Sequence, residues 1–278
     1  RPLRSFSVSP PSIGVIGLGH MAQALIEPLI TSGSVDPDQV TAVVGRPESV
    51  AALKQGVFGR CVIHSAESAE AAEVLTAPLQ LLAIKPQQVE HAAASLPAVG
   101  GSPLLVSVLA GVNLSRLERL FPSHRVVRAV PNTPALVGQG LTALAWGDNV
   151  SSSQRQEVQA LFAGVGEVLE LAEEKLDAFL ALTSSGPAFV ALVAEAMADG
   201  AVAAGLPRDL AQRLAHRTLA GSAALLDQRQ LHPASLKDMV ASPGGTTIAG
   251  VRALERGGLR SALMEAVIAA AERSRELA

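Results

Sequence analysis

The chain has 278 residues, 49% of them hydrophobic and 17% charged, so it is long enough for one large domain or two ordinary ones and too apolar for a disordered protein. Its 22 Lys and Arg residues and 25 Asp and Glu residues give a net charge of −3, without the basic excess of a general nucleic-acid binder. The single cysteine, Cys61, excludes an intrachain disulfide framework and a thiolate metal cluster, and we expect no bound metal.

The apolar segments are shorter than a membrane span requires. The richest, residues 188–204, is interrupted by Glu195 and Asp199, so it does not reach the ~18 consecutive apolar residues that cross a bilayer. Residues 1–12 are rich in Arg, Ser and Pro and contain no acid, which is typical of a disordered lead-in and also of a transit-peptide remnant. We therefore expect a soluble cytoplasmic protein without membrane partners, with import into an organelle as the alternative.

In the first half of the chain, short aliphatic and β-branched runs alternate with helical stretches. The predicted strands cover residues 13–16, 40–44, 61–64, 79–84, 104–108, 126–130 and 141–145. The predicted helices cover residues 21–32 and 47–55, an Ala- and Glu-rich segment before residue 79, a segment opened by Pro86, and residues 114–121. Because such alternation builds a parallel sheet with helices on both faces, we predict an α/β, doubly wound, Rossmann-type domain.

From about Glu173 the strand pattern gives way to Ala- and Leu-rich helical stretches. Gly and Pro residues end one helix and begin the next at residues 186–187, 205–207, 232–233 and 243–245. The helix over residues 189–204 is apolar on most faces, and in a domain of about 100 residues such a helix needs a partner to cover it. We therefore predict a NAD(P)-binding domain over residues 13–172 and an all-α dimerisation and substrate-binding domain over residues 173–278.

A glycine-rich turn follows the first predicted strand. Gly17 and Gly19 permit a tight turn and let a pyrophosphate approach the backbone, and the small Ala22 lets the next helix pack on the strand. The N-terminus of that helix offers free N–H groups and a partial positive charge to phosphates. This pattern predicts a dinucleotide site, although a glycine turn can also be purely structural.

The end of the second strand indicates which dinucleotide binds. An NAD site usually has an acid about 20 residues beyond the glycines, which binds the ribose 2′-hydroxyl. This chain has Gly45 and Arg46 there, while Asp36 and Asp38 precede the strand and lie at its wrong end. A guanidinium binds phosphate through two parallel hydrogen bonds, so Arg46 favours NADPH over NADH. A solvent-exposed arginine before a helix is the alternative reading.

The fourth and fifth strands end in residues suited to the rest of the cofactor. Lys85 would reach a ribose hydroxyl or the substrate from the carboxyl edge, or remain a surface lysine, and Pro86 opens the next helix. Beyond the fifth strand, Ala110 and Gly111 are small enough for a nicotinamide to lie flat. We assign to the cofactor site Ile16, Gly17, Leu18, Gly19, His20, Met21, Ala22, Gly45, Arg46, Ala83, Ile84, Lys85, Pro86, Ala110, Gly111 and Asn132.

A turn in the helical half combines glycines with hydroxyl side chains. Gly244 and Gly245 remove side chains from a turn that opens a helix, and Ser242, Thr246 and Thr247 place hydroxyls around it. Exposed N–H groups and hydroxyls at a helix N-terminus form a cradle for a carboxylate without Lys or Arg. An ordinary capped turn has the same composition, so both readings stand on the pattern alone.

Five segments together resemble the pyrroline-5-carboxylate reductase family in order and spacing. They are Gly17-Leu18-Gly19-His20-Met21-Ala22, Ala83-Ile84-Lys85-Pro86, Val130-Pro131-Asn132-Thr133-Pro134, Ser184-Ser185-Gly186-Pro187-Ala188-Phe189 and Ala241-Ser242-Pro243-Gly244-Gly245-Thr246-Thr247-Ile248-Ala249-Gly250. The last segment is the most specific, and the resemblance covers residues 13–277.

The resemblance implies reduction of the cyclic imine 1-pyrroline-5-carboxylate to L-proline by NAD(P)H, the last step of proline biosynthesis, by an oxidoreductase acting on a C=N bond. It places Thr247, as the catalytic residue, against the substrate nitrogen or carboxylate. It also places Ser242, Gly244, Gly245 and Thr246 around the substrate carboxylate. The family further implies an intertwined homodimer that can assemble into decamers, with an active site shared between subunits.

One position has two readings, and three others depart from the family pattern. Glu173 matches a family position near the substrate amine, and is equally a solvated acid at a helix start. The chain has Met239 where related animal members have an Asn near the cofactor, Gln230 where some have a Glu, and Val130 where Met or Thr is usual. These departures concern cofactor contacts, not the reaction.

Two rival functions make different demands on the sequence. A hydroxyacid dehydrogenase or ketopantoate-type reductase needs a catalytic Lys on the helix after the nucleotide domain, where this chain has Ala188, Phe189 and Val190. A non-enzymatic NADP sensor would keep Gly17 and Gly19 but would not need the hydroxyl-rich turn. That turn therefore discriminates an enzyme from a sensor.

Overall fold

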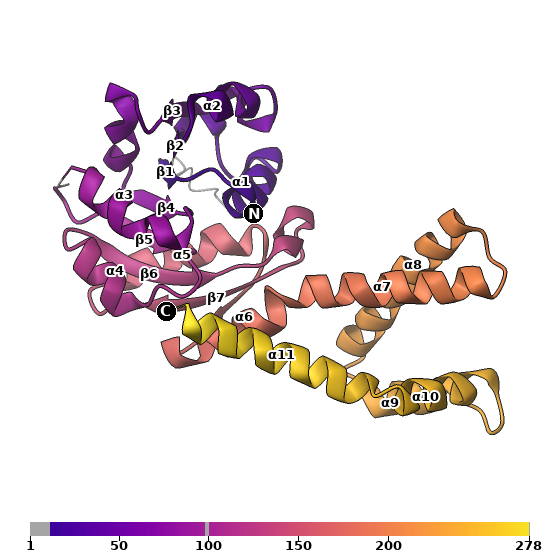
Figure 1. The fold of residues 1–278 in the computed structure, drawn as a ribbon. Coiled ribbons are helices and arrows are strands. Elements are labelled where there is room, and N and C mark those ends of the chain that lie inside the picture. The colour runs from indigo at the N-terminus through magenta and orange to yellow at the C-terminus, as the bar shows by residue number, and fades with distance from the viewer. Residues whose placement is uncertain (1–11, 98–99, 278) are drawn as a thin grey trace, which may run out of the picture. The chain divides into compact units, whose positions relative to one another are not determined.

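The computed structural model describes residues 12–97 and 100–277, and the chain divides into two compact units (Figure 1). Unit 1 comprises Arg1–Ser184 and Ala271–Ala278, and unit 2 comprises Ser185–Ala270. The expected lead-in lies, up to residue 11, outside the described residues. The units thus divide at Ser184, whereas the sequence pattern predicts a boundary after residue 172.

Helix α6 (Leu176–Thr183) accounts for the later boundary. Leu176 is buried in a cluster with Val130 and Ala143 of the sheet, and Phe179 and Leu180 pack against the same cluster. Because α6 covers an apolar part of the sheet, it belongs to unit 1 rather than to the helical unit.

Unit 1 is built on an eight-stranded sheet in the order β3-β2-β1-β4-β5-β6-β7-β8. The strands are β1 (Ile13–Ile16), β2 (Val40–Val44), β3 (Val62–Ser65), β4 (Leu79–Leu82), β5 (Leu104–Ser107), β6 (Arg125–Val130), β7 (Gly140–Trp146) and β8 (Gly166–Glu170). All neighbouring pairs are parallel except β6 and β7, so the predicted doubly wound sheet is confirmed with one antiparallel pair. The strand order reverses between β1 and β4, and ligands of such folds bind beyond the carboxyl ends at that reversal.

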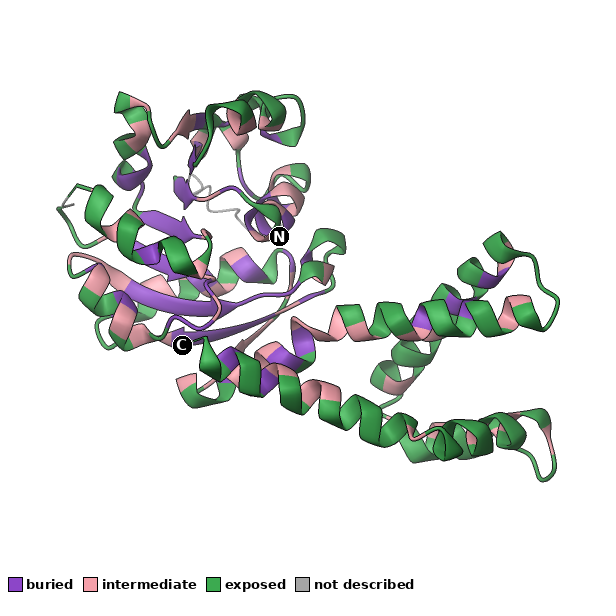
Figure 2. Ribbon diagram, viewed as in Figure 1, coloured by how far each residue is buried: buried purple, intermediate pink, exposed green. Residues whose placement is uncertain are grey.

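Helices cover both faces of this sheet. The α-helices are α1 (His20–Thr31), α2 (Pro47–Leu53), α3 (Val89–Ser95), α4 (Leu114–Leu120), α5 (Ser152–Ala163) and α6, and the 3₁₀ helices are η1 (Pro37–Gln39), η2 (Val57–Arg60), η3 (Ala69–Thr76), η4 (Pro86–Gln88), η5 (Thr133–Val137) and η6 (Glu173–Lys175). On one face Ile13 and Val15 join a buried cluster with Leu25 of α1 and Phe162 of α5. On the other face Ile16 joins a second cluster that includes residues of α3 and α4. The strands between these layers are the buried centre of unit 1 (Figure 2).

The largest differences from the predictions concern α5, β8 and η3. Helix α5 and strand β8 were not expected, and β8 pairs only with β7, with half-buried and exposed residues instead of an apolar run. The Ala- and Glu-rich segment before β4 forms a 3₁₀ helix, η3, and not an α-helix. Its backbone lies so close to β1 that a Cβ on Gly14 would be 2.2 Å from the carbonyl oxygen of Val74.

Unit 2 is entirely helical in its regular structure, as predicted. Its helices are α7 (Gly186–Ala203), α8 (Arg208–Gln228), α9 (Pro233–Val240), α10 (Thr246–Arg256) and most of α11 (Leu259–Glu276), whose last residues belong to unit 1. Ala198, Ala211 and Ala215 form a small buried cluster where α7 meets α8. Most other side chains of these helices are exposed (Figure 2), including large apolar ones such as Leu192 at 67%.

One stretch of the described residues, Glu173–Ala203, is long and apolar enough to cross a membrane by length and composition alone; its most apolar window of 18 residues has a mean hydropathy of 1.6. Only 11% of its most apolar window is buried. The stretch is not one continuous helix, because a turn at residues 184–185 separates α6 from α7.

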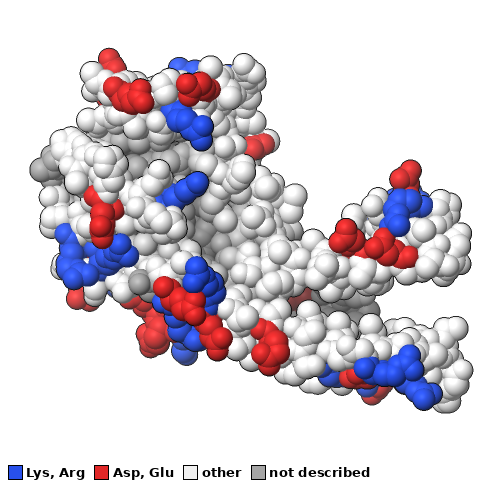
Figure 3. Space-filling model, viewed as in Figure 1, with Lys and Arg blue, Asp and Glu red and all other residues white. Residues whose placement is uncertain are grey.

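The charged side chains are mixed in sign. On the visible face of the molecule, Lys and Arg side chains are interspersed with Asp and Glu (Figure 3).

Candidate functional site

The turn between β1 and α1 requires a glycine at residue 17. Gly17 has a φ of 93°, in the left-handed region, and a Cβ there would lie 2.7 Å from Cγ2 of Ile84 and 2.8 Å from the carbonyl oxygen of Ala83. The Gly17 N–H donates to the Val43 carbonyl at 2.9 Å, and the Ala83 N–H donates to the Ile16 carbonyl at 2.8 Å. The turn therefore joins the carboxyl ends of β1, β2 and β4.

Gly19 leaves the N-terminus of α1 open to a ligand. Gly19 is the N-cap residue, no side chain caps the first turn, and a Cβ on Gly19 would meet nothing within 4 Å. The first helical bond runs from the Gln23 N–H to the Gly19 carbonyl at 2.9 Å, so the N–H groups of His20, Met21 and Ala22 precede the helical bonding pattern. Open N–H groups at the positive end of a helix suit a pyrophosphate.

This opening belongs to a cleft of about 720 Å³ at the carboxyl edge of the sheet. Arg46, Ser49 and Lys85 line it together with residues of the glycine turn. Arg46 and Lys85 are exposed, and neither takes part in an ion pair among the described residues. Two free cations and a helix N-terminus thus face one cleft, which fits the phosphates of a dinucleotide.

A second cleft of about 500 Å³ adjoins the first and shares Gly17, Gly45, Ile84 and Gln88 with it. Its further lining includes Ile16, Ala66, Ser68, Ala69, Ala71 and His91. The hydroxyl oxygen of Ser68 is buried and has no hydrogen-bond partner among the described residues. Mostly small apolar walls with a few polar groups fit a flat heteroaromatic ring.

Several residues that line the clefts are not among those that the sequence predicts, because they belong neither to the glycine turn nor to a strand end. Ser49 and Gln88 line the first cleft, and Ser68 and His91 line the second. Gln88 follows Lys85 by one helical turn, and that spacing could have identified it. Ser68 carries no comparable signal.

Other predicted cofactor residues take different places. Ala22 is fully buried and packs α1 on the sheet, as predicted, and Pro86 opens η4. Asn132 is 3% exposed; its amide nitrogen donates to the Thr183 carbonyl at 2.9 Å and its amide oxygen accepts from the Leu141 N–H at 2.8 Å. The structure therefore gives the Asn132 side chain the role of joining β6, β7 and α6, and does not bring it into either cleft.

The loop after β5, residues 108–113, contains Ala110 and Gly111 and lies at the same carboxyl edge. Gly111 has a φ of 72°, and a Cβ there would lie 2.7 Å from the backbone of Leu277. At the start of the loop, the Leu109 N–H donates to Oγ of the fully buried Ser107 at 3.3 Å. The loop is thus closely packed, and the lining of the two clefts does not include it.

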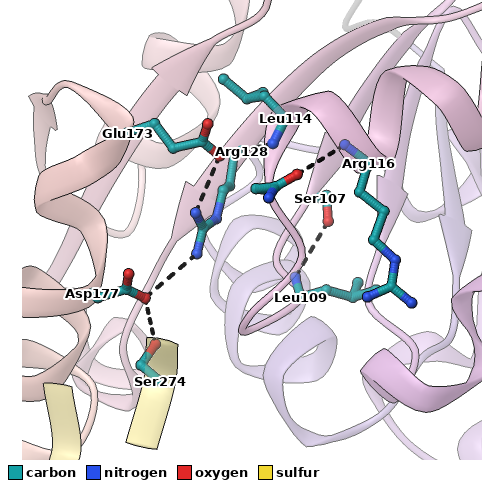
Figure 4. Close-up of polar contacts among 9 residues, drawn as sticks. Ser107, Leu109, Leu114, Arg116, Arg128, Glu173, Asp177 and Ser274 are labelled. Atoms are coloured by element: carbon teal, nitrogen blue, oxygen red, sulfur yellow. Dashed lines mark hydrogen bonds and ion pairs between the residues drawn. The ribbon is translucent and has the colours of Figure 1, made fainter. Parts of the chain in front are cut away.

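Glu173, at a helix start with a side chain 30% exposed, takes part in a partly buried charge network (Figure 4). Its Oε1 lies 3.1 Å from Nη1 of Arg128 and accepts from the Leu114 N–H at 2.7 Å. Arg128, which is 4% exposed, also lies 3.9 Å from Asp177, and Asp177 accepts a 2.6 Å hydrogen bond from Ser274. Glu173 belongs to unit 1, whereas the other predicted substrate residues belong to unit 2.

The predicted carboxylate cradle is the turn between α9 and α10. Gly244 has a φ of 66°, and Gly245 is the N-cap residue of α10, without a side-chain cap. The Gly245 N–H donates to the Ser242 carbonyl at 3.0 Å, and a Cβ on Gly245 would be 2.3 Å from Oγ of Ser242. The N–H groups of Thr246 and Thr247 in the first turn of α10 therefore stand beside three hydroxyls, an arrangement that can bind a carboxylate.

The described residues contain no group of three or more His, Cys, Asp or Glu side chains that could hold a metal ion. Burial raises the pKa of Cys61 to about 11, so this thiol stays protonated at neutral pH and is a poor nucleophile. The open helix N-termini at Gly19 in unit 1 and at Gly245 in unit 2 are both groups that can bind an anion.

Comparison with known proteins agrees with this arrangement. A family profile described as pyrroline-5-carboxylate reductase dimerisation matches residues 173–277, and one described as NADP oxidoreductase, coenzyme F420-dependent, matches residues 12–111. A pyrroline-5-carboxylate reductase of Synechocystis is 46% identical over 95% of this chain and 97% of that protein. One of Arabidopsis thaliana is 39% identical over 99% of this chain and 97% of that protein.

Solved structures are similar over the same extent. The pyrroline carboxylate reductase of Plasmodium falciparum, solved with NADP bound, matches with a TM-score of 0.86 at 28% identity, over 96% of this chain and 98% of that one. A 1-pyrroline-5-carboxylate reductase of Streptococcus pyogenes matches with a TM-score of 0.83 at 29% identity, over 95% and 98%. The likeness therefore extends through both units.

Proposed function

This chain belongs to the pyrroline-5-carboxylate reductase family, and we propose that the clefts of unit 1 and the cradle of unit 2 hold the two reactants of that family's reaction. The reaction is the NAD(P)H-dependent reduction of 1-pyrroline-5-carboxylate to L-proline, so the enzyme is an oxidoreductase acting on a C=N bond. The observation that carries the proposal is that open helix N-termini occur at both predicted anion sites, at Gly19 and at Gly245.

Different residues of unit 1 bind different parts of the cofactor. The N–H groups at the start of α1 bind the pyrophosphate, and the second cleft, with Ser68 and His91, takes the adenine ring. Lys85 serves a ribose hydroxyl or phosphate in the first cleft. When bound, NAD(P)H supplies a hydride from C4 of its nicotinamide.

The residues of unit 2 orient the imine. The backbone N–H groups of Thr246 and Thr247 bind the carboxylate with Ser242 beside them, and the Thr247 hydroxyl bonds the ring nitrogen or the carboxylate. Hydride adds to the imine carbon, the C=N electron pair moves to nitrogen, and the nitrogen keeps the proton of the protonated imine. Since a protonated imine is already electrophilic, positioning is the main task of these residues.

We propose that NADPH is preferred over NADH. Arg46 stands at the end of β2, lines the first cleft and has Ser49 one helical turn further on. Both side chains donate hydrogen bonds to phosphate, and the strand end lacks the acid that would bind a free 2′-hydroxyl.

We propose further that the helices of unit 2 are covered by a second copy of the chain, in an intertwined homodimer that can assemble into a decamer. A groove of about 890 Å³ lies between α7 and α8, and its lining includes Val190, Ala191 and Ala194. Exposed apolar residues continue along the other helices, including Leu254 of α10 and Met264 of α11. Apolar surface on this scale marks an interface.

We propose that the protein is located in the cytoplasm, and cell fractionation tests this location.

The proposed function is tested by the loss of NADPH absorbance with racemic 1-pyrroline-5-carboxylate, with NADH in parallel and proline measured as product. We expect turnover with both, and a lower KM for NADPH. Thr247→Ala should lower kcat/KM about ten- to a hundredfold, the cost of one hydrogen bond to a charged group, and leave NADPH binding unchanged.

Thr31→Ala is the matched control, because Thr31 is exposed in unit 1 and bonds only the carbonyl of Glu27 in its own helix. It should leave kcat/KM unchanged. Tight NADPH binding without turnover of the imine would contradict the proposed function and favour a sensor. Equal KM values for NADPH and NADH would contradict the role of Arg46 but not the proposed reaction.

A further inference from the structure

The loop after β5, residues 108–113, is held at its middle and at its far end by residues remote in the sequence. Its far end leads into α4, whose first N–H, from Leu114, donates to Glu173 at 2.7 Å. Its middle, at Gly111, packs on the backbone of Leu277 so closely that a Cβ would be 2.7 Å away. Both contacts lie within unit 1.

One buried arginine connects these two supports (Figure 4). Nη1 of Arg128 lies 3.1 Å from Glu173, and Nη2 lies 3.9 Å from Asp177. Asp177 accepts a 2.6 Å hydrogen bond from Ser274, which is 3% exposed in the last turn of α11. The chain of contacts therefore runs from the start of α4 through β6 and α6 to the turn that carries Leu277.

The last turn of α11 links the Asp177 contact to the loop. The Leu277 N–H donates to the Ser274 carbonyl at 3.2 Å, so the residue that contacts Gly111 is held by the residue that bonds Asp177. Gly111 in turn can accept this contact because it has no side chain and a φ of 72°.

Stability alone does not explain why Arg128 is buried in unit 1. Burying an ion pair costs so much solvation that apolar residues of the same size often stabilise a fold equally well. Nε of Arg128 is moreover buried without a partner among the described residues, which adds to that cost. A fixed polar network instead specifies one arrangement of the segments that it joins.

We propose that Arg128, Glu173, Asp177 and Ser274 form a positioning cluster that fixes the loop of Ala110 and Gly111 under the nicotinamide half of the cofactor. This inference rests on the proposed function. In a doubly wound sheet the dinucleotide spans the strand-order reversal, so with the adenine half beyond β1 and β2 the nicotinamide half lies beyond β4 and β5. None of the four residues lines either cleft, and Ser274 acts through Asp177 and Leu277.

The first test uses Ser274→Ala, which removes one hydroxyl and introduces no volume. We expect kcat to fall about three- to tenfold, because misplacement of a reactant by an ångström can cost roughly a hundredfold. The deuterium isotope effect on kcat, with NADPH deuterated at nicotinamide C4, should rise as hydride transfer becomes slower, while the Kd for NADPH changes by less than about twofold. Ser274→Thr, which restores a hydroxyl, should restore both values.

A second readout does not depend on turnover. Hydrogen exchange in the cofactor-free protein should be faster in Ser274→Ala at the Leu114 amide and in residues 109–113, by about tenfold, while exchange in β1 stays unchanged. Ser261→Ala is the matched control, because Ser261 lies on the same helix, is exposed and bonds only the nearby Gly258 carbonyl. It should change neither exchange nor kcat.

If hydrogen exchange in residues 109–114 of Ser274→Ala were as slow as in the wild-type protein, the proposed positioning role would be contradicted. A loss of kcat that Ser274→Thr does not restore, or one without a change in the isotope effect, would also contradict it. Absence of turnover in the wild-type protein would contradict the proposed function instead, and the exchange measurement would still decide whether the cluster holds the loop.

Discussion

The amide oxygen of Gln80 lies 3.1 Å from Nε2 of His124, 44 residues further along the chain. The Gln80 amide nitrogen donates to the carbonyls of Leu75 and Ala77 at 3.0 and 3.1 Å, so the amide oxygen must be the acceptor and His124 carries its proton on Nε2. Nδ1 of His124 is buried without a partner among the described residues. Burial lowers the pKa of His124 from its ordinary 6.5.

The His124 pair predicts a loss of stability in mild acid. The pKa is lower in the folded than in the unfolded protein, so the unfolded chain binds the proton first and stability falls as the pH drops below about 6.5. Melting temperatures from pH 8 to pH 5 should show this fall, and His124→Asn should flatten it. The exposed His91, changed to Asn, should leave the wild-type slope; an unchanged slope in His124→Asn would contradict the prediction.

Gly17→Ala should abolish NADPH binding and destabilise unit 1. The new Cβ would be strained at a φ of 93° and would meet the Ala83 carbonyl oxygen at 2.8 Å, so the turn must move away from β4. Gly33→Ala is the matched control, because Gly33 has a φ of 77° but open space around its Cα. The control should cost only the ~1–2 kcal/mol of left-handed strain and keep NADPH binding. Titration of NADPH fluorescence and urea unfolding measure the two effects.

Arg46→Ala should raise the KM for NADPH about tenfold and leave the KM for NADH unchanged, because only the first cofactor carries a 2′-phosphate. Lys54→Ala provides the comparison, since Lys54 ends the same helix, is exposed and does not line the cleft. Steady-state kinetics with each cofactor measure the two KM values. A parallel rise in both KM values would show that Arg46 binds a part common to the two.

Leu192→Asp should break the dimer. Leu192 is 67% exposed on α7, and a carboxylate at a covered apolar interface costs roughly 2–4 kcal/mol, so the Kd for association should rise by one to three orders of magnitude. Light scattering after size-exclusion chromatography measures the mass. Val57→Asp, at a 39% exposed apolar residue of unit 1, should leave the mass unchanged. A dimeric Leu192→Asp protein would place the interface elsewhere.

The features that sequence reasoning located best are those with local causes. Gly17 and Gly19 follow a strand and open a helix, and the structure places both at the carboxyl edge beside Ala83 and Lys85, as expected. The turn at Gly244 and its helix start were likewise readable, because a positive φ and an open helix end depend on a few neighbouring residues.

The features that it could not locate depend on distant partners. Glu173 reads as a helix-start acid until Arg128 of β6, 45 residues away, is seen beside it. Asn132 belongs to a family segment, yet its amide is engaged by Thr183 and Leu141 through the fold. Strand β8 has no apolar run, and only its pairing with β7 makes it a strand.

Unit 2 is inserted into unit 1, since the chain leaves the sheet at Ser184 and returns to it at Ala271. On the ribosome the whole of unit 2 must therefore emerge before Ser274 can bond Asp177, 97 residues behind it. Until then the nascent nucleotide-binding unit carries Arg128 and its carboxylates without the final turn that closes over them. Contacts of such long range slow folding, so the contacts of Ser274 and Leu277 should form late in the folding of unit 1, after the sheet itself.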